Sequence, residues 1–528
     1  MNNPYYSKKQ SVYAKNGVVA TSEGLAAQAG LEILKKGGNA IDAAVATAAA
    51  LTVVEPTSNG IGSDCFALVY FNDKLYGMNS SGYSSKNISI DKVKERGFNS
   101  MPSSGVIPIT VPGTPKGWAS LINKWGTLSL LEVLTPAINL AREGFVISET
   151  VGFYFERAMA IYKKRNQGTE YEQFFKVFTK NGVSYKAGDI FKSEYHAKTL
   201  EEIGKTNSDS FYTGALAEKI VTFMEKHNGY IDRSDLAEYN SEFVKPISVN
   251  YKGYDVCEIP PNGQGITALM ALNLLNDENL EQRKVETTHK QIESLKIAFS
   301  DTLEYVTDPN FMKIDAGYLL SKEYVKLRKK DITNSAVLHK PIEYKKAGTV
   351  YLATADKDGN MVSFIQSNYM GFGSGIMIDG TGIAMQNRGH TFSLDESHHN
   401  KLEPRKRTYH TIIPGFLMKD DIAVGPFGVM GGFMQPQGHL QVIMNLVDYK
   451  MNPQSALDAP RFRWDEKLTV ALENTFDELV IQKLRDKGHH IKIELDGGGF
   501  GRGQIIIKEN NHYIAGTETR CDGFIAYY

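Results

Sequence analysis

Helical patterns dominate the first part of the chain. Residues 22–36 carry Leu25, Leu31 and Leu34 among their apolar positions, and Gly37-Gly38 follows them as a stop signal. Asn39 stands where an N-cap is needed for a second helix, predicted over residues 40–51. That segment has small side chains nearly all round, so it should be buried and tightly packed. Further helices are predicted over 286–301 and 318–330, and residues 119–235 should form an outer helical layer.

Hairpin patterns dominate after residue 349. Two roughly alternating apolar runs, 350–355 and 361–365, flank the turn sequence DKDGN, which has glycine where a positive φ is needed. Hairpins are also predicted over 416–424 and 505–515, and an earlier one over 66–78 with its turn at Asn72-Asp73. Helices followed by hairpins fit antiparallel sheets between helical layers, which is an α+β fold.

Composition narrows the class of protein further. The 528 residues include 59 basic and 60 acidic side chains, which gives no electrostatic reason to expect nucleic acid or an anionic membrane as partner. The hydrophobic fraction of 42% and the aromatic fraction of 10% are typical of a globular protein with a sizeable core. Length alone suggests two to four domains, although one large sandwich can hold as many residues.

Targeting, redox and metal signals are weak. The first residues lack the charged-then-apolar pattern of a signal peptide, and the apolar stretch 40–54 is too short to span a bilayer, so we expect a cytoplasmic protein without membrane contact. The cysteines, Cys65, Cys257 and Cys521, predict no disulfide framework. The pairs His398-His399 and His489-His490 lie in polar, turn-like contexts, so they predict solvated surface and no metal site.

Gly348-Thr349, at the head of the 350–365 hairpin, suits one particular chemistry. If the chain were cut between these residues, Thr349 would carry both a nucleophilic hydroxyl and a free α-amine. Such an amine has an ordinary pKa of about 7.7–8.0 and can accept the hydroxyl proton without a histidine. The dipeptide alone is common, and it fits the end of a loop and the start of a strand equally well.

The wider context resembles the γ-glutamyltransferase family of N-terminal-nucleophile hydrolases. The resemblance rests on an ordered set of motifs: Gly37 to Ala44, Val111-Pro112-Gly113, Pro260 to Gly263, His289 to Asp308-Pro309, Thr349 with the DKDGN turn, Gly371 to Ile376, Gly431-Gly432 before the helix at His439, and Asp458 to Phe462. No single piece is decisive, but the ordered set is highly specific.

This resemblance implies an αββα sandwich and a proenzyme that cleaves itself before Thr349. The products would be a large-subunit segment, 1–348, and a small-subunit segment, 349–528, which together form one sandwich. Gly348 allows the strained approach that cleavage needs. Ser367 falls where the family places a hydroxyl beside the nucleophile, and Gly431 with Gly432 where it places its oxyanion donors.

The positions that bind substrate depart from the family. Typical members hold the glutamyl α-carboxylate with an arginine, but this chain has Asn79 to Tyr83 at that place. The remaining substrate positions fall on Tyr369, Arg388, Thr391, His410 and Thr411. Arg388 could bind a carboxylate from the opposite wall, and it could equally be a surface charge. These changes resemble the branch of the family likened to cephalosporin acylases.

We therefore expect an autoprocessing amidohydrolase that acts on a small-molecule substrate and uses no cofactor. The favoured substrates are γ-glutamyl amides such as glutathione. The alternatives are an acylase for glutaryl or other N-acyl amides, and an inactive relative that serves as a binding protein. The sequence leaves the acceptor and the oligomeric state open.

Overall fold

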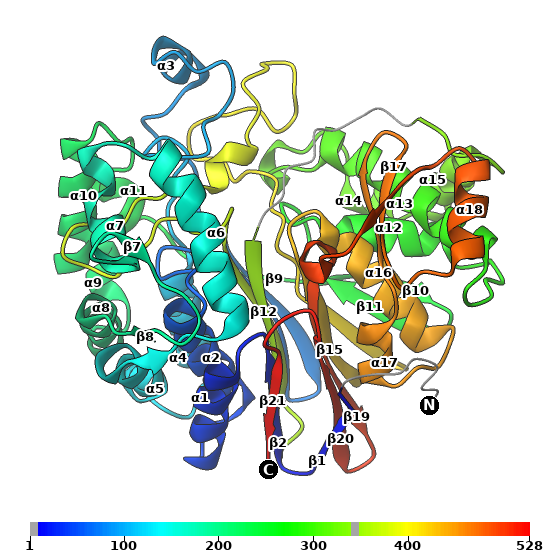
Figure 1. Ribbon diagram of the computed structural model, residues 1–528, viewed down its shortest axis with the longest axis horizontal. Helices are drawn as coiled ribbons and strands as arrows, with labels where there is room; N and C mark the ends of the chain where they lie inside the picture. Colours follow the sequence, from blue (N-terminus) through cyan, green and yellow to red (C-terminus); the bar gives the residue numbers. More distant parts are fainter. Residues whose placement is uncertain (1–8, 339–347) are drawn as a thin grey trace.

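Two seven-stranded antiparallel sheets face each other in the middle of the molecule (Figure 1). The computed structural model describes residues 9–338 and 348–528. In order across it, the first sheet contains β21 (Phe524–Tyr527), β2 (Gly17–Thr21), β12 (Gly348–Asp356), β13 (Met361–Tyr369), β3 (Asp64–Phe71), β4 (Lys74–Ser80) and β9 (Glu242–Val244). The second contains β1 (Val12–Ala14), β20 (His512–Thr517), β19 (Arg502–Glu509), β15 (Ile422–Met430), β14 (Gly415–Lys419), β11 (Tyr254–Glu258) and β10 (Ile247–Tyr251).

Alternation along the strands separates the core into layers. On β12, Tyr351, Ala353 and Ala355 pack between the two sheets, whereas Val350 and Leu352 pack against the helices behind the first sheet. A strand buried on both faces is apolar at nearly every position, with successive side chains on opposite faces. This explains why the run 350–355 reads as a hairpin strand without a polar face.

One helical layer covers the outer face of the first sheet, on the left in Figure 1. Asn39 Oδ1 accepts hydrogen bonds from the backbone N–H groups of Ile41 and Asp42, and every residue of the helix it caps is buried, which confirms that prediction. The helices of this side are α1 (Gly24–Lys35), α2 (Ala40–Val54), α4 (Thr114–Trp125), α5 (Leu130–Glu143), α6 (Glu149–Arg165), α7 (Glu172–Phe178), α8 (Glu194–Lys205), α9 (Asp209–Tyr212), α10 (Ala215–Lys226) and α11 (Arg233–Ala237), with α3 (Ile90–Glu95) above them.

A second helical layer covers the second sheet. It contains α12 (Gly265–Leu275), α13 (Val285–Tyr305), α14 (Ala316–Leu319), α15 (Lys322–Arg328), α16 (Met434–Val447), α17 (Pro453–Asp458) and α18 (Glu478–Asp486). The prediction of one helix over 318–330 is wrong. The hydroxyl of Ser321 accepts a hydrogen bond from the backbone N–H of Tyr324, so it caps a new helix and divides the segment.

Short strands complete the structure outside the two large sheets. They are β16 (Phe462–Glu466), β17 (Thr469–Glu473) and β18 (His490–Glu494) in one sheet, β5 (Phe145–Val146) with β8 (Ile190–Phe191), and β6 (Thr179–Lys180) with β7 (Val183–Ser184). The predicted turn at Asn72-Asp73 is confirmed, because both residues have positive φ between β3 and β4.

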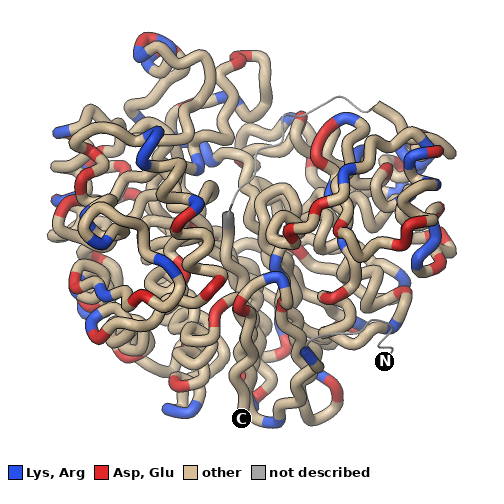
Figure 2. Tube along the Cα trace, in the orientation of Figure 1, with Lys and Arg blue, Asp and Glu red and all other residues tan. Residues whose placement is uncertain are grey.

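The layers together form an αββα sandwich, so the predicted α+β class is confirmed. Charged residues of both signs are interspersed over the outer helices, whereas the central strands carry few of them (Figure 2). Within residues 9–338 and 348–528, no helix combines the length and the apolar character that a membrane crossing requires.

Candidate active site

The candidate nucleophile lies at the first residues of β12. Thr349 Oγ1 donates a hydrogen bond of 3.1 Å to Ser367 Oγ on the neighbouring strand β13, and both side chains are fully buried. The pairing register shifts between Gly348 and Val350, so Thr349 lies at a β-bulge or similar irregularity. Such bulges re-aim side chains and are frequent beside active sites. The structure thus brings the two hydroxyls together, while the segment 341–347 lies outside the described residues.

Ser367 is held by the turn that follows it. Its Oγ also accepts a hydrogen bond of 2.8 Å from the backbone N–H of Tyr369. Tyr369 has a φ of 76°, a value that bulky residues rarely adopt, and its side chain is buried. Backbone strain of this kind concentrates at functional sites. The turn therefore fixes the hydroxyl that accepts the hydrogen bond from Thr349.

The glycine pair lies between the end of β15 and the start of α16. Gly431 and Gly432 have φ values of 139° and 61°, which favour glycine. Their carbonyls accept hydrogen bonds from the backbone N–H groups of Met434 and Gln435, which belong to the first turn of α16. The carbonyls of this turn are thus used within the molecule, and the backbone N–H groups of Gly431 and Gly432 are the groups that the turn can offer to a ligand.

Packing across the sandwich brings this turn towards the start of β12. A Cβ on Gly428, near the end of β15, would lie only 2.5 Å from the ring of Tyr351. Tyr351 comes two residues after Thr349, and Gly428 three residues before Gly431. The close approach of the two strands therefore depends on glycine, and it directs the glycine pair to the end of the sandwich that carries the nucleophile.

Arg388 belongs to the short turn η4 (Arg388–Thr391), and it is only 1% exposed, which excludes a surface charge. Its Nη1 donates a hydrogen bond of 2.8 Å to Thr411 Oγ1, and its Cζ lies 4.4 Å from the centre of the Tyr369 ring. Its Nε and Nη2 have no hydrogen-bond partner among residues 9–338 and 348–528. Burial lowers the pKa of Arg388 to about 10, although the nearby Asp64 carboxylate opposes this shift. Arg388 is therefore a buried cation at neutral pH with unused donors.

Asp64 is the charged partner that sequence reasoning missed. It begins β3 directly opposite Ser367 in the strand register, and its Oδ2 lies 3.8 Å from Arg388 Nε. Burial raises the pKa of Asp64 to about 7, while Arg388 and a hydrogen bond from the backbone N–H of Gly82 oppose that shift. An acidic residue at the head of the apolar run 64–71 is the signal that could have identified it.

His410 completes this group. Its Nε2 lies 3.1 Å from Asp64 Oδ2, and its Nδ1 accepts a hydrogen bond from the backbone N–H of Ile412, so the proton is on Nε2 and points to the carboxylate. Burial, with Arg388 nearby, holds the pKa of His410 well below its ordinary value, and the ring is neutral. Tyr369, Arg388, His410 and Thr411 thus lie in one buried polar cluster around Asp64, which we call the Asp64 cluster.

An arginine from elsewhere in the chain lies against residues 79–83. Arg407 Nε donates a hydrogen bond of 3.0 Å to the carbonyl of Ser81, and its Cζ lies 4.3 Å from the centre of the Tyr83 ring. Sequence reasoning missed this contact, because the two segments are more than 300 residues apart. However, Arg407 Nη1 is paired with Glu242 at 2.7 Å, so this guanidinium is already neutralised.

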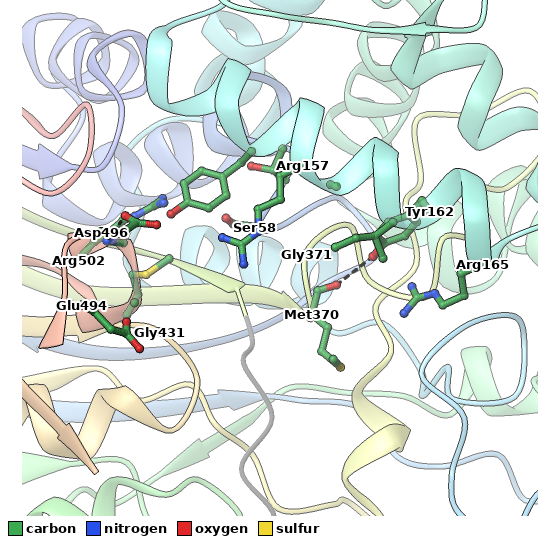
Figure 3. A pocket seen from close by; sticks show the side chains of 17 residues that line it. Ser58, Arg157, Tyr162, Arg165, Met370, Gly371, Gly431, Glu494, Asp496 and Arg502 are labelled. Carbon is green, nitrogen blue, oxygen red and sulfur yellow. Dashed lines mark hydrogen bonds between the residues drawn. The ribbon is translucent and has the colours of Figure 1, made fainter. Parts of the chain in front are cut away.

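Two cavities lie beside Tyr369 and the glycine pair. The first, of about 320 Å³, is bordered by α6, Met370, Gly431 and the loop 494–502 (Figure 3). The second, of about 310 Å³, is bordered by residues that include Tyr369 and Phe433. Tyr369, the last residue of β13, lines the second cavity, and Met370 lines the first; in the glycine turn, Gly431 lines the first cavity and Phe433 the second. The two cavities therefore lie on opposite sides of these two segments, which are the ones connected to Ser367 and to the glycine pair.

One group outside the site has the composition of a metal site. Ligand atoms of His289, Glu293 and His489 lie within 4.8 Å of one another. His489 is buried, so the prediction that it is solvated is wrong: His289, 200 residues away, is 2.8 Å from it. His289 Nε2 already donates to the Thr333 carbonyl, and Glu293 accepts from the ammonium of Lys296. Because these groups are engaged with one another, we assign no metal to them.

Comparison with known proteins gives a consistent result over the whole chain. The family described as Gamma-glutamyltranspeptidase matches residues 26–528. The "Glutathione hydrolase-like YwrD proenzyme" of Bacillus subtilis (strain 168) is 37% identical, over 97% of this chain and 99% of that protein. The "Acylase ACY 1 proenzyme" of Pseudomonas sp. (strain SE83) is 30% identical, over 92% of this chain and 88% of that protein. The crystal structure of a cephalosporin acylase from Bacillus halodurans covers 100% of this chain with 98% of its own, at 53% identity and a TM-score of 0.97.

The fold is the αββα sandwich of the N-terminal-nucleophile hydrolases. The chain belongs to the gamma-glutamyltranspeptidase family. Its relatives include proteins named as glutathione hydrolases and as acylases. The family thus agrees with the resemblance that the sequence motifs indicate.

Proposed function

We propose that this protein is a self-processing amidohydrolase whose nucleophile is the hydroxyl of Thr349. The observation that carries the proposal is the buried 3.1 Å hydrogen bond from Thr349 Oγ1 to Ser367 Oγ, at the register shift near the start of β12. In the first step the hydroxyl attacks the carbonyl of Gly348, and hydrolysis of the resulting ester separates segments 1–348 and 349–528. The word "proenzyme" in the names of the relatives supports this step.

Catalysis then uses the same atom. Thr349 Oγ1 attacks the carbonyl carbon of a substrate amide and passes its proton to the α-amine that cleavage has freed. The N–H groups of Gly431 and Gly432 stabilise the oxyanion, because these are the donors left over by the carbonyl contacts of that turn. The leaving amine takes the proton, and water or an acceptor amine releases the acyl group from the threonine.

The substrate we propose is an amide of an acyl group that ends in a carboxylate. Arg388 supports this choice, since Nε and Nη2 of this buried cation make no hydrogen bond to the described residues. A carboxylate accepts two such donors at once. γ-Glutamyl amides, glutathione among them, are the first candidates, in keeping with relatives named glutathione hydrolase.

Glutaryl amides are the second candidate, and one observation favours them. A γ-glutamyl group also carries an α-ammonium, which needs an acidic partner. In the Asp64 cluster the acidic group is Asp64, whose Oδ2 already accepts from His410 and faces Arg388. The neighbour titled cephalosporin acylase supports an acylase activity in general.

The test begins with the intact mass of the purified protein. We expect pieces of roughly 39 and 20 kDa, in proportion to segments of 348 and 180 residues of the 58.6 kDa chain. The cleaved protein is then assayed with γ-glutamyl and glutaryl amides of one amine, and with an acetyl amide as the uncharged control. A chain that stays whole yet hydrolyses these amides would contradict the mechanism. A whole and inactive chain would support an inactive binding protein.

A further inference from the structure

We infer that the cavity beneath α6 binds the amine half of the substrate, and that this half carries a carboxylate. The inference rests on the proposed function, because it names the leaving group of the same reaction. We call this cavity the α6 cleft. It is the cavity of about 320 Å³ that is bordered by α6, Met370, Gly431 and the loop 494–502.

Position is the first argument. Gly431, a proposed oxyanion donor, borders the α6 cleft, and so does Met370, which follows Tyr369 in the turn fixed to Ser367. The second cavity lies on the side of Tyr369 and Phe433. An amide bound across the reaction centre has two halves, and its acyl half belongs with Tyr369 and Arg388. The α6 cleft is then the space left for the other half.

The rigidity of the wall is the second argument. The single O–H of Tyr162 on α6 lies within hydrogen-bond distance of two carbonyls, that of Met370 at 3.1 Å (Figure 3) and that of Gly373 at 2.9 Å, and the two share it. These bonds tie the helix to the turn that follows the candidate active-site strand. The backbone of α6 is thereby held at a fixed position relative to the turn that follows β13.

Charge is the third argument. Arg157 descends from α6 into the middle of the cleft (Figure 3), and it forms no hydrogen bond or ion pair with any residue of 9–338 or 348–528. Arg165, two turns further along the same face, has the neutral partners Asn166 and Ser103. The cleft therefore offers two cations whose charge the described residues leave unpaired.

Most of the remaining charged residues of the cleft form ion pairs. Arg502 is paired with Glu55 at 3.1 Å, and Glu494 with Arg463 at 2.8 Å. Asp496 is exposed and accepts a hydrogen bond from the backbone N–H of Gly498. One carboxylate against two unpaired guanidinium groups leaves the cleft positive, and a planar guanidinium is well suited to bind a carboxylate through two hydrogen bonds. An amine such as an amino acid or a dipeptide has this group.

The test compares substrates that differ only in this carboxylate. The probes are the γ-glutamyl and glutaryl amides of glycylglycine and of glycylglycinamide. We expect the wild type to hydrolyse each glycylglycine probe with a kcat/KM about 10-fold higher than that of the matching glycylglycinamide probe. Arg157→Gln should remove this preference, and Arg157→Lys should keep part of it. Hydrolysis of the glycylglycinamide probes, which lack the carboxylate, should change little in either variant.

Arg96→Gln is the matched control, because Arg96 is an exposed arginine outside the cleft whose partner is the carbonyl of Asn228. It should leave the preference unchanged. The inference would be overturned if the wild type hydrolysed the glycylglycine and glycylglycinamide probes equally. A preference for glycylglycine probes that survives Arg157→Gln would overturn it as well.

A binding measurement separates this inference from the proposed function. Glycylglycine alone is titrated into the wild type and into Arg157→Gln by calorimetry, with glycylglycinamide as the uncharged probe. If the wild type hydrolyses none of the four amides, the proposed function fails, and the titration still decides the inference. Tighter binding of glycylglycine that is lost in Arg157→Gln supports it, and equal binding in both proteins overturns it.

Discussion

The nucleophile end of the site and the Asp64 cluster are neighbours that are built in opposite ways. Thr349, Ser367 and the glycine pair are uncharged, and their positions are set by strand pairing, a bulge and helix-terminal hydrogen bonds. The Asp64 cluster consists of a buried carboxylate, a buried guanidinium and a neutral imidazole, held by one another. In the mechanism that we propose, the groups that cleave the bond are therefore positioned mainly by the backbone of the fold, whereas recognition rests on a few charged side chains.

The Asp64 cluster, which we propose for substrate recognition, also differs from what the resemblance implies. Its cation comes from η4, and residues 79–83 supply none. A buried charge must be paired or used, because its desolvation cost is large. Asp64 meets part of this requirement for Arg388, and the substrate carboxylate that we propose would meet the rest.

The largest effect should follow removal of the nucleophile. Thr349→Ala should leave one uncut chain under denaturing electrophoresis and reduce turnover by roughly 10⁴-fold or more, because the same hydroxyl serves both reactions. Thr354→Ala is the control: this buried threonine lies on the same strand, with its hydroxyl bonded to the carbonyl of Ala40. Full processing of the Thr349→Ala chain would show that Thr349 is not the nucleophile. The contrast between the nucleophile end and the Asp64 cluster would then no longer hold.

Substitution of Gly431 tests whether the backbone carries the chemistry. A Cβ at this position would lie 3.3 Å from Gly501 Cα and from Met434 Cβ, at a φ of 139° that side chains disfavour. Gly431→Ala should therefore displace a donor and lower kcat by roughly 100-fold, with little change in KM.

Gly380→Ala provides the control for backbone strain, since Gly380 also has a positive φ but open space around its Cβ position. Both variants should lose stability in chemical denaturation, but only Gly431→Ala should lose turnover. A normal kcat for Gly431→Ala would return this glycine to a packing role.

Arg388→Gln should affect recognition without affecting processing. Loss of a charge-assisted pair should lower kcat/KM for glutaryl and γ-glutamyl amides by roughly 10- to 150-fold, while an acetyl amide is hydrolysed as before. Cleavage before Thr349 should be complete by intact mass. An equal loss on charged and uncharged acyl groups would mean that Arg388 only supports the structure.

The smallest effect should be a pH dependence that originates in Asp64. Burial raises its pKa to about 7, so below that pH the carboxyl is neutral and Arg388 is uncompensated. Above it the carboxylate forms and neutralises part of the charge that the substrate needs. KM for a glutaryl amide should therefore rise about two- to five-fold between pH 6 and pH 8.5.

Asp64→Asn is the matched variant for this profile, because it keeps the shape and removes the titration. It should flatten the KM profile for glutaryl amides, and an acetyl amide should show no such profile in either protein. An unchanged profile in Asp64→Asn would assign the titration to another group.

Local sequence signals predicted much of the architecture. Alternation and turn residues identified the hairpins of β3–β4, β12–β13, β14–β15 and β19–β20, since these depend on neighbours in the chain. The cap at Asn39 and the burial of α2 were also predicted from local sequence. The single helix over 318–330 failed because a capping serine within it starts a new helix.

Within the candidate site, the sequence by itself determined the residue types of the chemistry: a glycine–threonine pair at a strand start, a serine on the neighbouring strand and two adjacent glycines. Only the tertiary structure decided where the charges lie. Strand pairing brings Asp64 opposite Ser367, and burial turns Arg388 from a possible surface charge into a buried cation. Such contacts join segments hundreds of residues apart, and the free energy of burying a charge depends on all the groups that surround it, which no local pattern records.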